Sequence, residues 1–440
     1  MINIDSCSIF SCVLFCALMA GQSPGEEISS GQIVADVLQH SYPLKMAGEQ
    51  VTAAEAVKQQ ADAALFPSLD LDGRAAHYWG LKANNLGPDV WIPAIPDRYG
   101  GGIAFSQPLY TGGRISGHRA MADEQRRAAH SSLSASRVDV IYRALTAYWL
   151  WSKAFYAAES FRAAVAWMES HDHDMRNLWK AGLVTENDKL STSVRLDQTR
   201  LRLEEALRYT SLCRAAIERS TGKILPDDAV PVRPDSDSIS SIKSKQELIK
   251  GALTNRPDIQ AQKFMLNAAR KNIQIQNANY YPQFNARLRG EVGRPNQLNI
   301  PPEDDWLFDA FIGVGASWNI LDWGLTRGRV NEAKARANHV GYQLSQLNEQ
   351  VVFEVRQALI NLENAKTKVT VARRAEKSAK LDLKSATDLW QNGLARHSDV
   401  LDAQMRLTDA SFDLVDASAD VAIACAELDH AYGTSKPDSH

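Results

Sequence analysis

The sequence contains two near copies of one stretch, and this internal repeat constrains the fold more than any other feature. LWKAGLVTENDKLSTSVRL occupies residues 178–196, and LWQNGLARHSDVLDAQMRL occupies residues 389–407, at an offset of 211 residues. The shared positions include the tryptophan, the glycine and the leucine after it in the pattern LWxxGL. With 440 residues the chain is longer than one usual core, so the repeat predicts one architectural unit built twice.

Composition excludes several classes of function. The formal net charge of -3, with 23% charged residues, gives no basic field for nucleic acid. The sequence has no GxSxG elbow, Walker loop or HExxH pattern, and no glycine-rich motif in a Rossmann context, so we predict neither an enzyme nor a bound cofactor. The run HDHD at 171–174 is a poor metal site because helical residues two apart point to different sides, and we predict a solvated helix surface there.

The first residues predict export. The apolar run at 9–21 is too short to span a bilayer as a helix and has the length of a signal-peptide core, so residues 1–20 are the predicted signal peptide. No Lys or Arg precedes the run, which leaves a buried first helix of a non-exported chain as the alternative. Cys7, Cys12 and Cys16 lie in this segment without a good lipobox, and Cys213 and Cys425 are predicted to be small buried thiols.

Four segments alternate apolar and polar residues with a period of two, which predicts strands at about 68–81, 99–108, 282–293 and 306–320. Residues 84–98 and 294–305 are predicted loops. Strands of about ten residues can cross a hydrocarbon layer when tilted, but four cannot close a barrel, so several chains would have to share one. The alternative is a soluble sheet packed on helices.

Each half also contains a long proline-free helical segment followed by a shorter one. The long segments are 114–181 and 325–391, each about 100 Å as a helix, and the shorter ones are 187–221 and 398–432. The LWxxGL turn joins long to short in each half. Apolar residues spaced by threes and fours along the second long helix, including Val351, Val355 and Leu362, predict a coiled-coil seam. The predicted organisation is a first repeat at 21–222, a linker at 223–244 and a second repeat at 245–440.

The chain resembles the TolC family of outer-membrane efflux proteins. The matching features are FP at 66–67 and YP at 281–282 before strands, SQPLYTGGR at 106–114, NRPD at 255–258 and SWNILDWG at 317–324, in their order across both halves. The resemblance implies a mainly α, internally duplicated fold with a membrane β-barrel portion. In that fold, a homotrimer combines a trimeric α-helical tunnel with a shared twelve-stranded β-barrel, four strands per chain.

The resemblance also implies the function. It predicts an outer-membrane channel of a tripartite efflux pump or a type I secretion system, with its barrel in outer-membrane lipid and its helical portion in the periplasm. Such a channel is a passive conduit, gated at its periplasmic tip and docked by a periplasmic adaptor that connects it to an inner-membrane pump. The alternative is a periplasmic adaptor or structural coiled-coil protein, which would ordinarily have one helical hairpin.

The predicted pore gate is Asp399 with Asp402. Within the family an aspartate pair in a DVLD sequence constricts the tunnel entrance, and DVLD stands intact at 399–402. Residues i and i+3 share a helix face, so three copies would bring six carboxylates together. The alternative role is stabilisation of the helix start. The first repeat has Asp188 and Ser191 at these places, so only the second keeps the pair.

The duplicated turns are the predicted docking surface for the adaptor, with tip packing as the alternative. Ala395 stands where the family usually has a gate-locking arginine, with Arg396 one residue later, so the family's latch is not carried over. The docking residues are Trp179, Gly182, Leu183, Trp390, Gly393 and Leu394.

Overall fold

The computed structural model describes residues 27–87, 90–234, 244–295 and 301–434. The predicted signal peptide and its three cysteines lie outside these residues. The chain divides into two compact units, each built from both halves of the sequence. Of the residues that the structure describes, those up to Leu44, those within Ser136–Asn255 and those from Val351 onward form one unit, and those within Lys45–Ala135 and Arg256–Gln350 form the other.

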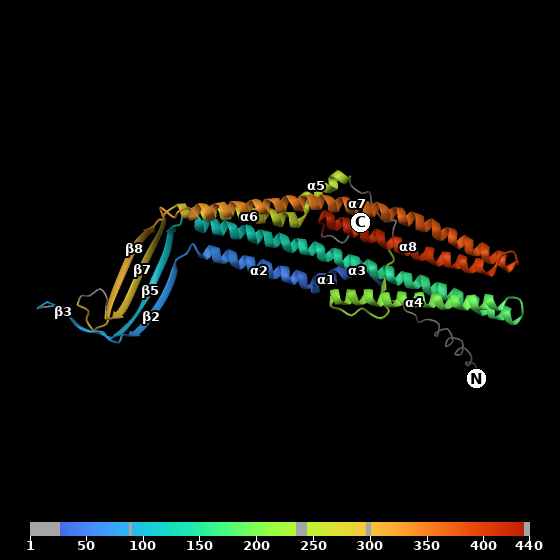
Figure 1. Ribbon diagram of the computed structural model, residues 1–440, viewed down its shortest axis with the longest axis horizontal. Helices are drawn as coiled ribbons and strands as arrows, with labels where there is room; N and C mark the ends of the chain where they lie inside the picture. The colour runs from blue at the N-terminus through green and yellow to red at the C-terminus, as the bar shows by residue number, and fades with distance from the viewer. Residues whose placement is uncertain (1–26, 88–89, 235–243, 296–300, 435–440) are drawn as a thin grey trace, which may run out of the picture. The chain divides into compact units, whose positions relative to one another are not determined.

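The second unit holds a four-stranded antiparallel sheet in the order β2-β5-β7-β8 (Figure 1). The strands are β2 (Ser68–His77), β5 (Asp97–Tyr110), β7 (Gln283–Arg294) and β8 (Leu307–Ser317). The central pair, β5 and β7, joins the two halves of the sequence, with Phe105 opposite Leu288. The predicted loop at 84–98 is wrong in part, because β3 (Asn84–Gly87) and β4 (Val90–Ile92) form an antiparallel pair there.

The sheet has one apolar and one charged face. The register places Leu69, Phe105, Leu288 and Ile312 in one row across the four strands, and all four side chains are exposed. On the other face Arg289 bonds Asp72 and Glu291, each at 3.1 Å. A soluble sheet packed on helices would bury its apolar face, so the exposure of this row argues against that alternative.

Long helices make up most of the rest. They are α2 (Tyr42–Ala63), α3 (Arg114–Lys180), α4 (Glu186–Thr221), α6 (Pro257–Asn277), α7 (Leu325–Gln391) and α8 (His397–Tyr432), with the shorter α1 (Ser30–His40) and α5 (Lys245–Asn255). A 3-10 turn, η1, occupies Ala278–Tyr280. In the described part of the chain, no helix combines the length and apolar character needed to cross a membrane. The predicted seam on α7 is confirmed, because Val351, Val355 and Leu362 are buried.

The core of the first unit includes part of the predicted linker. Tyr148 and Trp151 of α3 pack with residues of α1 and α4 and with Leu225 and Ala229. The Tyr148 hydroxyl donates to the carbonyl of Ile28 at 2.8 Å and accepts from the amide of Val232 at 2.9 Å. These bonds hold β1 (Glu27–Ile28) and β6 (Val230–Pro231), a parallel pair, against α3. Residues 225–232 are therefore packed structure and not a free linker.

Candidate functional site

The two LWxxGL turns end α3 and α7 with the same hydrogen bonds. The amide of Leu183 donates to the carbonyl of Leu178, and the amide of Gly182 to that of Trp179, both at 2.9 Å. The amides of Leu394 and Gly393 repeat the pattern at 2.9 Å. Both glycines have φ +73°, the left-handed conformation that this C-terminal motif requires and that glycine adopts without strain. The repeated sequence therefore encodes one helix ending twice.

These endings expose the residues that follow them. Leu183 is 72% exposed and Leu394 is 75% exposed. Trp179 is 40% exposed, and the ammonium of Lys189 lies 3.7 Å from the centre of its ring. Trp390 is less exposed than Trp179 and is half-buried. The two copies thus share their turn geometry but not the surroundings of their tryptophans.

An aspartate is the third residue of the return helix in both copies. Asp188 accepts from the amide of Thr185 at 3.1 Å, and the Thr185 hydroxyl accepts from the amide of Asp188 at 3.2 Å. The Thr185 hydroxyl also donates to the Asp188 carboxylate at 2.6 Å, and this bond, with the smaller contribution of the Thr185 amide, lowers the pKa of Asp188. In the second copy, Asp399 accepts from the amide of Arg396 at 3.0 Å. Asp399 therefore has the helix-start contact that was the alternative to a gating role.

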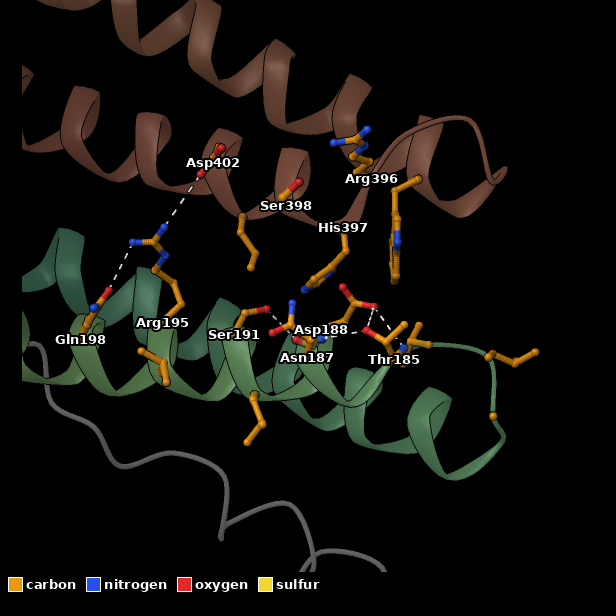
Figure 2. A pocket seen from close by; sticks show the side chains of 17 residues that line it. Thr185, Asn187, Asp188, Ser191, Arg195, Gln198, Arg396, His397, Ser398 and Asp402 are labelled. Atoms are coloured by element: carbon orange, nitrogen blue, oxygen red, sulfur yellow. Dashed lines mark hydrogen bonds and ion pairs between the residues drawn. The ribbon is translucent and has the colours of Figure 1, made fainter.

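An open groove of about 1050 Å³ separates the first turn of α4 from that of α8 (Figure 2). Asp402 reaches across it toward Arg195 of α4, with 3.9 Å between Oδ1 and Nη2. Arg195 also donates to Gln198 at 3.2 Å. Four of the predicted site residues line the groove: Gly182, Leu183, Trp390 and Asp402. The described residues that line it do not include the other four, Trp179, Gly393, Leu394 and Asp399.

A buried aromatic cluster lies beside this groove. The His171 ring stacks on those of Trp167 and His397, with centroids 4.8 and 5.0 Å apart, and Trp390 contacts both histidines edgewise or tilted at 5.6 and 5.7 Å. Asp172 is also buried and is bonded by Arg176 at 2.7 Å. The prediction of a solvated surface at 171–174 is therefore wrong for His171 and Asp172.

Burial affects the acid–base behaviour of both histidines. It lowers the pKa of His171 to about 4 and also lowers that of His397. The described residues include no group of three or more His, Cys, Asp or Glu side chains placed to hold a metal ion. Two features of the sequence could have indicated the cluster. Trp167 precedes His171 by one helical turn, and His397 replaces Glu186 of the first copy.

The sequence that forms these helical hairpins and the sheet matches known proteins. Residues 33–223 and 248–434 match the model of the outer membrane efflux protein family. The cation efflux system protein CusC of Escherichia coli K12 is 24% identical over 396 residues, which cover 85% of this chain and 80% of CusC. The outer membrane efflux protein BepC of Brucella suis biovar 1 is 24% identical over 306 residues, 69% of this chain and 65% of BepC.

Solved structures share the fold. The outer membrane protein VceC of Vibrio cholerae superposes with a TM-score of 0.76 at 21% identity, covering 92% of this chain and 96% of VceC. A CusC structure gives a TM-score of 0.79 at 18% identity over 94% and 95% of the two chains. The fold is thus the one that the TolC resemblance implied, and the adaptor alternative has no support among these matches. Because both halves of the sequence match the family model, the chain belongs to the outer membrane efflux protein family.

Proposed function

We propose that this chain forms a homotrimeric conduit for efflux, gated where its helical turns meet and docked there by a periplasmic adaptor that connects it to an inner-membrane pump. The observation that carries the proposal is the sheet, which presents a continuous apolar row on one face and ends in two open edges. A lone sheet of this kind in lipid would leave the edge backbone groups unpaired. Copies of the chain that join edge to edge pair these backbone groups and form a closed barrel whose apolar face can contact lipid. Three copies give the twelve strands of the family's barrel.

The helices support the same oligomer. On α7, Phe353, Ile360 and Val371 are exposed and spaced by seven and eleven residues, which places them on one line of the helix. This line lies opposite the buried seam that contains Val351 and Leu362. A helix with apolar stripes on opposite sides needs a partner for each, and a second copy of the chain supplies the missing one.

Helix α4 has the same two-sided pattern. Leu190, Val194, Leu201 and Leu212 are exposed on one line, with spacings of four, seven and eleven residues. Leu196 and Ile217 are buried on the opposite side. Helices from each half of the sequence therefore offer a surface to another copy, as a closed ring of helices requires.

For the gate, we keep Asp399 and Asp402 as the charged pair. Asp402 faces Arg195 across the groove at 3.9 Å, a distance at which an exposed ion pair contributes only about 0–1 kcal/mol. A weak contact of this kind can be broken when an adaptor binds. In a ring of three copies the carboxylates would gather at the entrance, where they would attract cations and repel anions.

The gate predicts a change in ion selectivity. In planar bilayers, Asp399→Asn with Asp402→Asn is expected to lower cation preference and raise the current, because asparagine keeps an oxygen for the helix start but removes the charge. Asp388→Asn, which removes an exposed carboxylate from the end of α7, is the matched control and should conduct like the original protein. Unchanged current and selectivity in the double variant would remove these residues from the gate.

For docking, the exposed Leu183 and Leu394 are the proposed anchors. Each extends from a rigid helix ending, so it offers apolar area at small entropic cost. Trp179, Gly182, Trp390 and Gly393 complete the proposed surface by shaping the two turns. Because the two turns share their backbone geometry, one adaptor motif can bind either turn.

Charged substitutions test docking. Leu183→Glu combined with Leu394→Glu is expected to weaken adaptor binding at least about tenfold, since a buried carboxylate would replace apolar contact. The measurement is efflux of a fluorescent dye by cells, together with photo-cross-linking from position 391 to the adaptor. Asn177→Glu, one turn before the first ending, is the control. Trimers that still export dye and cross-link at normal levels would contradict the assignment.

A further inference from the structure

The stacked histidines connect the two helical hairpins beside the groove. His171 belongs to α3, the long helix of the first half, and His397 is the first residue of α8 in the second half. Their rings are nearly parallel, at 18°, and both side chains are more than nine-tenths buried. His397 thus fixes the start of α8, the helix that carries Asp399 and Asp402, against the first hairpin.

The hydrogen bonds define where the proton sits on His397. The Thr192 hydroxyl lies 2.8 Å from Nε2 of His397 and also 2.8 Å from the carbonyl oxygen of Asp188. The hydroxyl has one proton, and a carbonyl can only accept it, so Nε2 must donate to the hydroxyl oxygen. Nδ1 of the neutral ring is then an unprotonated acceptor, and Figure 2 shows this ring extending from α8 toward α4.

Neither histidine has a place for a second proton. Among the described residues, Nδ1 of His397 and Nε2 of His171 are buried without a hydrogen-bond partner. With both rings protonated, these two nitrogens would carry N–H groups without partners, and two cations would lie in a stack of 5.0 Å. Protonation therefore destabilises the stack.

The charged groups around the two histidines offset the cost of protonating them only weakly. Asp172 and Asp174 of α3 favour protonation of His171, and Asp188 of α4 favours protonation of His397. The Asp172 carboxylate already accepts hydrogen bonds from Arg176 and from the hydroxyl of Ser193. The Asp188 carboxylate accepts one from the amide of Thr185 at the start of α4. From α7 the group in contact is the uncharged ring of Trp390. On α8 itself, Asp399 is bonded to the amide of Arg396.

We propose that His171 and His397 form a proton-operated latch, which holds the start of α8 against α3 and α4 when neutral and releases it when protonated. The inference rests on the proposed gate and adds its regulation: acidification opens the groove between the two hairpins. Water that enters the opened cluster can then solvate both imidazolium rings.

The sign of the pH effect follows from the burial. The latched state has a pKa of about 4 at His171, below the ordinary 6.5 of a solvated ring. The latch is therefore at full strength above about pH 6.5 and weakens as the pH falls toward 4. At about pH 5.5 this difference favours the open state about tenfold per chain relative to pH 8. The lowered pKa of His397 acts in the same direction.

Channel recordings test the latch in the full-length protein. Open probability in planar bilayers is expected to rise at least about tenfold between about pH 8 and pH 5.5. His171→Phe should flatten this profile, and His171→Phe with His397→Phe should abolish it, because phenylalanine can stack but cannot titrate. His339→Gln, at an exposed position on α7, should keep the original profile. If the double variant fails to form trimers, His171→Phe alone decides.

A distance measurement separates the latch from the gate. Spin labels at cysteines replacing Leu183 and Leu394, with the other cysteines changed to serine, should move apart at about pH 5.5 in the original background and not in the phenylalanine variants. Labels that separate while conduction stays constant would uphold the latch and overturn the gate. Labels that do not separate, or that separate equally in the His171→Phe and double variants, would overturn the latch.

Discussion

Leu288→Arg is expected to abolish assembly of the channel in the outer membrane. Leu288 lies in the middle of β7 and in the apolar row that crosses all four strands, where its side chain is 47% exposed. An arginine near the midplane on the lipid face of a barrel costs about 2–4 kcal/mol, and a trimer would contain three of them. The sum is comparable to the whole stability of a typical domain.

Outer-membrane fractions provide the measurement for this prediction. The original protein should give trimer bands that dissociate on heating, and Leu288→Arg should give none. Asn285→Arg is the matched control, since residue 285 is an odd number of positions away on the same strand and points to the charged face. Trimer bands of normal strength in Leu288→Arg would show that this face does not contact lipid.

Phe353→Lys combined with Ile360→Lys should prevent trimer formation without unfolding the helices. The two side chains are 60% and 57% exposed in a single chain, so the substitutions should change the folding stability of the single chain little. In the proposed trimer they become buried, and the two lysines per chain would lose their hydration without a partner. The expected result is monomer in detergent by analytical ultracentrifugation, with helical circular dichroism retained.

Thr370→Lys is the control for this pair. It adds one lysine per chain, where the pair adds two, at an exposed position of α7 to one side of the apolar line. Trimers should therefore form in this variant at normal strength. Normal trimers in the double lysine variant would show that α7 does not pack against a second copy along this line.

Local rules made much of the fold predictable. The glycine of LWxxGL ended both long helices because its left-handed conformation is encoded within five residues. Alternation gave the four main strands, since the pleat requires only that one face be apolar. The segment 84–98 was different: its prolines, glycines and asparagines favour turns, yet β3 and β4 pair across it by backbone bonds that need no apolar pattern.

The interior of the site was not predictable from local patterns. His171 and His397 are 226 positions apart, and only the packing of α3 against α8 brings their rings together. Considered alone, the HDHD run has polar residues that suit a solvent-exposed face. Burial of Leu225 and Ala229 was missed for the same reason, because a segment rich in Pro, Asp and Ser becomes part of a core only through the aromatic residues of α3.

The order β2-β5-β7-β8 also determines how copies can meet. Neighbouring strands alternate in direction, and four is an even number, so the two edge strands β2 and β8 run in opposite directions. Copies related by rotation can therefore join β8 of one to β2 of the next as an antiparallel pair, and every seam of the ring obeys the same rule. An odd number of strands per chain would place a parallel seam at each junction. The parity that duplication guarantees is thus what allows a cyclic assembly to close with uniform hydrogen bonding.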